Sequence, residues 1–333
     1  MGNPKYCSRK RCEYSRDKVG TFFSLADYRN NLFVSKNLTD LVEFYDSFAN
    51  QGELIEWMKE RPKGSAYIRE ISGSKDVVVV IPTADINGKY AIYCKEKIFK
   101  GLHIIFVESG EIPDPYFNYA HNVNIGIKRA LEYNPKWVIY SNDDVISEDS
   151  STALVNELRT IDQLKVDCVF ANTFHYITRK WFHSTSHSDL IGKPSRIYWM
   201  LLELLGGDYK THGRIRKKFC EENYTNIMDK SYITRLMFKM VRRQIITNFF
   251  AILSSVYLNG KNGVLFDETY INAGEDVDLS IELNDSARTS KINYKIGDLQ
   301  GKSLGNFWDR RFRTSSGMAY FNYKLKNKLI FLL

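Results

Sequence analysis

The sequence contains few cysteines, and no apolar run in it reaches the length of a membrane span. Only 5 of its 333 residues are cysteines, and the closely spaced Cys7 and Cys12 lack the second pair that a zinc site needs. We therefore expect reduced thiols. About 18 consecutive apolar residues would be needed to cross a bilayer, and the polar start of the chain differs from a secretory signal. These absences favour a location in the cytoplasm.

The chain also lacks an excess of acidic residues. It carries 47 Lys and Arg against 39 Asp and Glu, which gives a formal charge of +8. Residues 176–248 alone hold 14 Lys and Arg against 6 Asp and Glu, so this one segment has an excess equal to that of the whole chain. Basic segments attract phosphate groups of nucleic acids, anionic lipids or phosphorylated substrates. The charge distribution predicts a phosphate-bearing partner without choosing its class.

Strand-like and helix-like segments alternate from residue 76 onward. Apolar runs at 77–81, 102–107 and 137–140 indicate buried strands, and apolar residues at helical spacing in 118–133 indicate a helix. This alternation predicts an α/β fold with a mostly parallel, doubly wound sheet. We expect five regions, which are a helical N-terminal flank (1–75), the first half of the α/β domain (76–172), a basic helical insertion (173–248), the second half of the domain (249–315) and an amphipathic C-terminal tail (316–333).

Acidic side chains follow the three apolar runs. Asp85 comes after the first run, Glu108 ends the second, and Asp143 and Asp144 come after the third. Doubly wound sheets bind ligands at the carboxyl ends of their strands. We therefore expect these four side chains at one edge of the sheet.

The triplet Asn142, Asp143 and Asp144 has the chemistry of a divalent-cation site. Carboxylate oxygens are hard ligands for Mg²⁺ or Mn²⁺, which usually bridges to substrate phosphates. The alternative is a turn whose acids cap the following helix. Residues 274–278, with the sequence GEDVD, either favour a helix N-terminus electrostatically or supply the base that transfer to a hydroxyl requires.

The order of these motifs resembles glycosyltransferase family 2 over about residues 76–313, with the insertion set aside. The matching segments are VVVIPT at 78–83, VESG at 107–110, NVNIG at 122–126, IYSNDDV at 139–145, FDE at 266–268 and GEDVDL at 274–279. The resemblance implies a GT-A fold and an inverting transfer from a nucleotide-diphosphate sugar donor to a hydroxyl of a glycan, lipid-linked or protein-linked acceptor. Residues 76–172 would bind the donor, and residues 249–315 would form the acceptor and catalytic half.

The resemblance also implies roles for individual residues. Asp144 and Asn142 match the outer positions of the family's Asp-x-Asp motif and would contact the metal. Asp276 matches the acid that usually serves as catalytic base, with Glu275 beside it. The donor pocket would be lined by Pro82, Thr83, Asp85, Glu108, Asn124 and Asp143.

Two positions depart from the family pattern. Asn142 replaces an aspartate, which lowers the negative charge of the metal site. Gln300 lies near the position where many relatives place a histidine, and its oxygen would still ligate a hard cation. The main alternative is therefore a catalytically degenerate protein that binds its ligand without transferring sugar.

Two other interpretations have less support. A nucleotidyltransferase that makes sugar nucleotides would need a basic, glycine-rich loop after the first strand, but residues 83–88 contain no arginine and no glycine cluster. A nucleic-acid-binding protein would use residues 176–248, but no nucleic-acid motif occurs there. We instead expect this insertion and the C-terminal tail to form the acceptor side and to contact the cytoplasmic face of an anionic membrane.

Overall fold

The computed structural model describes residues 24–110, 114–175 and 249–299, together with residues 313, 315–317, 319–321 and 323–324. An eight-stranded sheet has the strand order β1-β3-β2-β4-β7-β6-β8-β5. Most of the predicted insertion (176–248) and Gln300 lie outside the described residues, whereas residues 173–175 end a strand. The strands are β1 (Tyr67–Ile71), β2 (Ser74–Thr83), β3 (Leu102–Glu108), β4 (Trp137–Ser141), β5 (Val145–Ser147), β6 (Cys168–His175), β7 (Phe250–Ser254) and β8 (Thr289–Asp298).

The sheet is mixed, which corrects the prediction of a mostly parallel one. β2 runs parallel to both β3 and β4, and β6 runs parallel to β8. β1 with β3, β4 with β7, β6 with β7 and β5 with β8 are antiparallel pairs. β7 lies between β4 and β6 and runs antiparallel to both. The sequence could not predict this, because an apolar run indicates a buried strand but not its direction. The architecture is α/β, and the parallel strands β3, β2 and β4 lie side by side in one half of the sheet.

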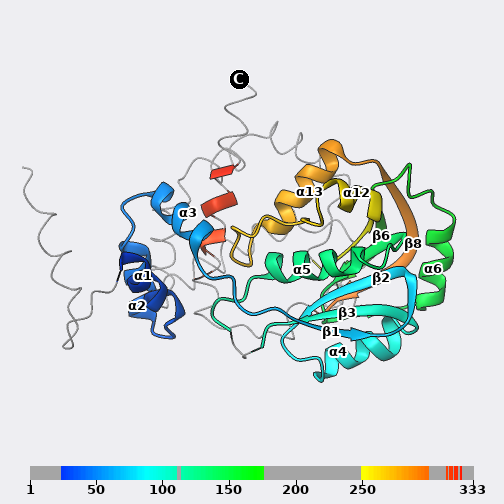
Figure 1. The fold of residues 1–333 in the computed structure, drawn as a ribbon, viewed down its shortest axis with the longest axis horizontal. Coiled ribbons are helices and arrows are strands. Elements are labelled where there is room, and N and C mark those ends of the chain that lie inside the picture. The colour runs from blue at the N-terminus through cyan, green and yellow to red at the C-terminus, as the bar shows by residue number, and fades with distance from the viewer. Residues whose placement is uncertain are drawn as a thin grey trace, which may run out of the picture.

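Helices cover both faces of the sheet. α5, α12 and α13 lie along one face, α4 and α6 lie on the other, and α1, α2 and α3 stand beyond one end (Figure 1). α5 begins where the side chain of Asn118 accepts a hydrogen bond from the N–H of His121. The helices are α1 (Leu25–Val34), α2 (Leu38–Asp46), α3 (Gln51–Glu60), α4 (Lys89–Tyr93), the π-helical turn η1 (Cys94–Ile98), α5 (Tyr119–Leu131), α6 (Ser151–Arg159), α12 (Ser255–Gly260) and α13 (Glu275–Ser286).

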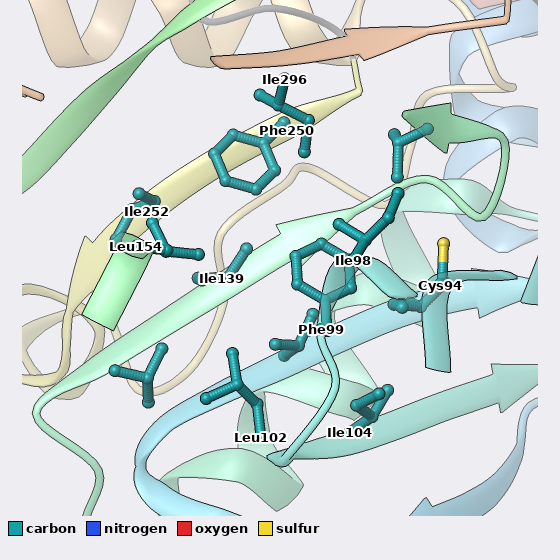
Figure 2. Close-up of a cluster of buried hydrophobic side chains, with 14 of the residues drawn as sticks. Cys94, Ile98, Phe99, Leu102, Ile104, Ile139, Leu154, Phe250, Ile252 and Ile296 are labelled. Carbon is teal, nitrogen blue, oxygen red and sulfur yellow. The ribbon is translucent and has the colours of Figure 1, made fainter. Parts of the chain in front are cut away.

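β2 buries both of its faces, as its continuous β-branched run predicts. Val77, Val79 and Ile81 belong to the core under α4 and α6, whereas Val78 and Val80 belong to the core under α5. Alternate residues of a strand point to opposite faces, so one strand serves both cores. Figure 2 shows part of the first core, with the labelled residues Cys94, Ile98, Phe99, Leu102, Ile104, Ile139, Leu154, Phe250, Ile252 and Ile296.

A third core joins the N-terminal helices to the C-terminal part of the chain. Arg313 donates to the backbone oxygens of Phe33 at 2.8 Å and Ser35 at 2.9 Å, and Gln51 Nε2 donates to the backbone oxygen of Ala319 at 2.9 Å. The buried members of this core are Phe33, Leu41, Phe44, Tyr45, Phe48, Leu54, Ile55, Trp57, Met58, Tyr270, Ile271, Ala319, Tyr320 and Phe321.

Strand β1 lies in the flank that was predicted to be helical. It pairs antiparallel with β3 at an edge of the sheet. Tyr67 is 53% exposed and Ile68 is 37% exposed, so the strand lacks the buried apolar pattern from which the other strands were predicted.

The described part of the C-terminal tail contributes to the core. Ala319, Tyr320 and Phe321 are buried against the N-terminal helices, so these apolar side chains stabilise the fold. Within the described ranges, no helix combines the length and the apolar character needed to cross a bilayer. Cys94 and Cys168 are buried free thiols, as predicted.

Candidate functional site

The carboxyl ends of β2, β3 and β4 bring three of the predicted residues together. Thr83 and Glu108 are partners in the register of β2 and β3. Thr83 Oγ1 donates a 2.8 Å hydrogen bond to Asp143 Oδ2, immediately after β4. The carboxylate of Glu108 accepts the N–H of Ile86 at 3.3 Å, in the loop that follows β2. Parallel strands end at the same edge of the sheet, which explains why these side chains meet.

Two other predicted donor-pocket residues differ in exposure. Pro82 is buried within β2, whereas Asp85 is exposed in the loop that follows. Asp85 Oδ1 accepts the N–H of Asn87 at 2.8 Å, which forms an Asx turn. Asp85 is therefore accessible to a ligand, whereas Pro82 is not.

The backbone of the triplet 142–144 is fixed by three separate parts of the chain. The bonds run from Asn142 N to Phe249 O at 2.8 Å, from Cys94 Sγ to Asp143 O at 3.1 Å and from Leu299 N to Asp144 O at 2.9 Å. Asp143 is 8% exposed and Asp144 is 2% exposed. The alternative that these acids cap the following helix is wrong, because the N-cap of α6 is Ser150, whose side chain accepts the N–H of Ala153.

Tyr119, the first residue of α5, interacts with two acidic pairs, which are Asp143 with Asp144 and Glu275 with Asp276. Its hydroxyl donates a 2.9 Å hydrogen bond to Asn142 Oδ1. Its pKa is raised well above the ordinary tyrosine value, chiefly by burial and further by four negative charges, those of Glu275, Asp276, Asp144 and Asp143. Two acidic pairs that are far apart in the sequence therefore act on one hydroxyl, which stays protonated.

The second acidic pair, Glu275 and Asp276, opens α13, as its motif predicted. Gly274 precedes it with φ of +94°, a left-handed conformation that favours glycine. The third acid of the motif, Asp278, forms an ion pair with Lys324. Asp278 therefore stabilises the fold through this ion pair. The acids of the candidate site are Glu275 and Asp276.

Asn124, which the resemblance placed near the nucleoside, is fully buried. Its Oδ1 accepts the N–H groups of Leu265 at 2.9 Å and Phe266 at 3.0 Å. Its Nδ2 donates to the backbone oxygen of Phe266 at 2.8 Å and to Glu268 Oε1 at 3.0 Å. We therefore assign Asn124 to holding the loop between α12 and α13 against α5, beneath the surface that a ligand would meet.

Sequence reasoning missed Tyr119 and the loop contacts around it. Tyr119 is one of 21 tyrosines, and no spacing distinguishes it from the others. Its N–H donates to Asn272 Oδ1 at 2.8 Å, and Asn272 Nδ2 donates to the backbone oxygen of Phe117 at 2.9 Å. These bonds anchor the start of α5 to the segment that leads into Glu275.

The first acidic pair, Asp143 and Asp144, is the predicted cation site. Among the described residues, no group of three or more His, Cys, Asp or Glu side chains is arranged to hold a metal ion. Mg²⁺ commonly uses one or two protein carboxylates and completes its shell with waters and substrate phosphates. Cation binding by Asp143 and Asp144 stays a prediction. The metal contacts expected of Asn142 and Gln300 stay predictions.

No protein-family model matches the sequence, and a search of curated proteins also found no match. The function is therefore inferred from the site itself. One acidic pair lies at the ends of parallel strands, a second lies at the N-terminus of a helix, and both act on Tyr119.

Proposed function

We propose that this chain is an inverting, metal-assisted glycosyltransferase with a GT-A fold, which moves a sugar from a nucleotide-diphosphate donor to an acceptor hydroxyl. The observation that carries the proposal is that Tyr119 is hydrogen-bonded to both regions that hold the acids. Its hydroxyl donates to Asn142 Oδ1 beside Asp143 and Asp144, and its N–H donates to Asn272 Oδ1 in the segment that leads into Glu275 and Asp276. Transfer to a hydroxyl needs a base for the acceptor and charge stabilisation for the leaving group. Two separate acidic pairs in one site supply both requirements.

Asp143 and Asp144 are the proposed cation ligands. Mg²⁺ or Mn²⁺ bound there would neutralise charge on the leaving nucleoside diphosphate. Thr83 holds the Asp143 carboxylate from β2, and Asp85 and Glu108 line the nucleoside side of the donor pocket. The parallel arrangement of β3, β2 and β4 supports this placement, since such strand ends commonly bind nucleotides.

Asp276 is the proposed catalytic base, and Glu275 lies beside it in the first turn of α13. The carboxylate of Asp276 would take the proton of the acceptor hydroxyl as the acceptor oxygen attacks the anomeric carbon. Gly274 is the N-cap of this helix, and its left-handed conformation sets where the helix that carries both acids begins.

The acceptor side is proposed to involve residues 176–248, whose basic charge suits an anionic membrane surface or a lipid-linked phosphate. Flotation of the full chain with vesicles tests this contact. We expect binding that increases with anionic lipid and decreases with salt. Flotation that responds to neither would remove membrane contact from the proposal.

A second candidate is a binding protein that recognises nucleotide sugars without transferring sugar. Asn142 favours it, because the position lacks a negative charge and its Oδ1 already accepts a hydrogen bond from Tyr119. Such a protein would bind the donor and leave it intact.

An assay of donor hydrolysis and sugar transfer with Mn²⁺ separates the two candidates. The variants Asp144→Asn and Asp276→Asn should each lose activity by about 100-fold or more, since they remove a charge or a base from the site. Asp162→Asn, at an exposed aspartate between α6 and β6, is the matched control. Full activity in both site variants would overturn the assigned roles, and donor binding without turnover in the wild type would favour the binding protein.

A further inference from the structure

The hydroxyl of Tyr119 has a single hydrogen-bond partner among the residues that the structure describes. That partner is Asn142 Oδ1, at 2.9 Å. A phenol hydroxyl is a strong donor and a weaker acceptor, and an amide oxygen is a strong acceptor. If the amide were reversed, Asn142 Nδ2 would donate to the phenol oxygen and the hydroxyl proton would lack an acceptor in these parts of the chain. The geometry therefore favours Asn142 Oδ1 as the acceptor.

This bond decides what Asn142 offers to a ligand. Its oxygen accepts the Tyr119 hydroxyl, and among the described residues none accepts a hydrogen bond from its Nδ2. Asn142 is partly exposed and lies directly before Asp143 and Asp144. The amide therefore has two N–H donors available to a ligand at the end of β4. Donors of this kind bind the oxygens of an anion, with added strength from the charge.

We infer that Asn142 binds a phosphate oxygen of the donor diphosphate through Nδ2, and that Tyr119 is the positioning residue that holds the amide in this orientation. The inference rests on the proposed function. It changes the role of Asn142 from a metal ligand to a phosphate-binding donor. An aspartate at this position would repel the diphosphate unless a cation lay between them.

Two binding measurements separate these roles. Calorimetry at saturating Mn²⁺ gives the Kd of uridine, guanosine, cytidine, adenosine and thymidine diphosphates, and the tightest of these is used for the variants. Electron paramagnetic resonance gives the Kd of Mn²⁺ alone. We expect Asn142→Ala to weaken the diphosphate by about 10-fold and to leave the Kd of Mn²⁺ unchanged.

Asn142→Asp and Tyr119→Phe sharpen the test. Asn142→Asp should weaken the diphosphate, because a donor is lost and a charge is added. Tyr119→Phe should weaken it several-fold in the wild-type background and have no further effect in Asn142→Ala, since the hydroxyl acts through the amide. Tyr133→Phe is the matched control, because it removes a hydroxyl beyond the other end of α5, about 20 Å away.

Each outcome decides a separate point. If Asn142→Ala weakens Mn²⁺ alone by about 10-fold, or if Asn142→Asp tightens Mn²⁺ and the diphosphate together, Asn142 is a metal ligand and the inference is wrong. If Tyr119→Phe weakens binding equally in both backgrounds, Tyr119 does not act through Asn142. If the wild type binds Mn²⁺ but no diphosphate, the proposed function fails and the inference fails with it.

Discussion

Gly126 lies in α5 above β2 and β3, where a side chain would have no room. A Cβ on Gly126 would come within 2.3 Å of Val80 Cγ1 and 2.9 Å of Val107 Cγ2. Both valines are β-branched and buried in the sheet, so neither moves easily. We expect Gly126→Ala to lower the free energy of unfolding by about 1–2 kcal/mol, because overpacking exceeds the helix-propensity gain of alanine.

Gly260 in α12 is the matched control for this substitution. A Cβ there meets no atom within 4 Å. Gly260→Ala should therefore be neutral or stabilise by up to about 1 kcal/mol. Urea denaturation of both variants checks the pair, and equal effects would show that α5 does not approach the sheet as closely as described.

The positions of single residues were predicted best where acidic residues directly follow an apolar run. Asp143 and Asp144 were found from their position after an apolar run, and the structure places Thr83 and Glu108 at the same edge. Tyr119 was missed because its role depends on a contact with Asn142 that no local pattern encodes. Contacts between distant elements are a tertiary property, so a residue that acts through them carries no sequence signal of its own.

Asn124 joins α5 to the loop before α13 through hydrogen bonds to the backbone of that loop. Replacing its amide in Asn124→Leu would leave the N–H groups of Leu265 and Phe266 without their acceptor. We expect a loss of about 2–4 kcal/mol in the free energy of unfolding, because buried unsatisfied donors are costly.

Asn122, two residues earlier in α5, gives a direct comparison. It is fully buried, and neither atom of its amide has a hydrogen-bond partner among the described residues. Asn122→Leu should be neutral or stabilise by about 1 kcal/mol, because it removes a buried amide that gains no hydrogen bond. Thermal and urea unfolding of the two leucine variants would contradict this account if the variants lost equal stability.

Among the elements, α5 and the strands β2, β3 and β4 were predicted correctly because each carries a strong local pattern. α5 has apolar residues at helical spacing, and β2 is a continuous β-branched run. The direction of β7 and the presence of β1 were not predicted. Strand direction follows from the path of the chain between strands, and β1 is an exposed edge strand that needs little apolar surface.

Across the whole molecule, α1, α2 and α3 stand beyond one end of the sheet (Figure 1). Their buried side chains share a core with Tyr270, Ile271 and residues 319–321. Tyr45 and Ser316 share a 2.9 Å hydrogen bond within this core. The segment held there leads directly into Gly274 and the acids of α13. The N-terminal helices therefore brace the segment before the proposed catalytic base, although they lie far from it in the sequence.

Lys324 connects this brace to the site. It pairs with Asp267 at 3.1 Å and with Asp278 in α13. Burial opposes ionisation of Asp267, but hydrogen bonds from Thr269 and Tyr320 and the charge of Lys324 outweigh it, so the pKa of Asp267 is lowered. Lys324→Met should cost about 1–3 kcal/mol at pH 7, because two partly buried carboxylates lose their cation.

The pH dependence of this cost has a defined sign. A carboxyl whose pKa is lowered in the folded state contributes stability that is present above its ordinary value of about 3.9 and lost as the pH falls through the folded value. The difference between wild type and Lys324→Met should therefore shrink below about pH 4. Urea denaturation at pH 7 and pH 3.5 tests this, with Lys165→Met at the exposed pair with Asp162 as a control that costs at most about 1 kcal/mol.

The central claim is that Asp143, Asp144, Glu275 and Asp276 form one donor-binding site that needs a divalent cation. Thermal unfolding of the wild type and Asp144→Asn with a panel of nucleotide-diphosphate sugars, with and without Mn²⁺, tests it most directly. A ligand at about 100 times its Kd stabilises the native state by about 2.7 kcal/mol. We predict that at least one sugar nucleotide raises the Tm of the wild type by roughly 2 °C or more, only with Mn²⁺ and not in Asp144→Asn. No shift with any sugar nucleotide, or the same shift in both proteins, would contradict the account.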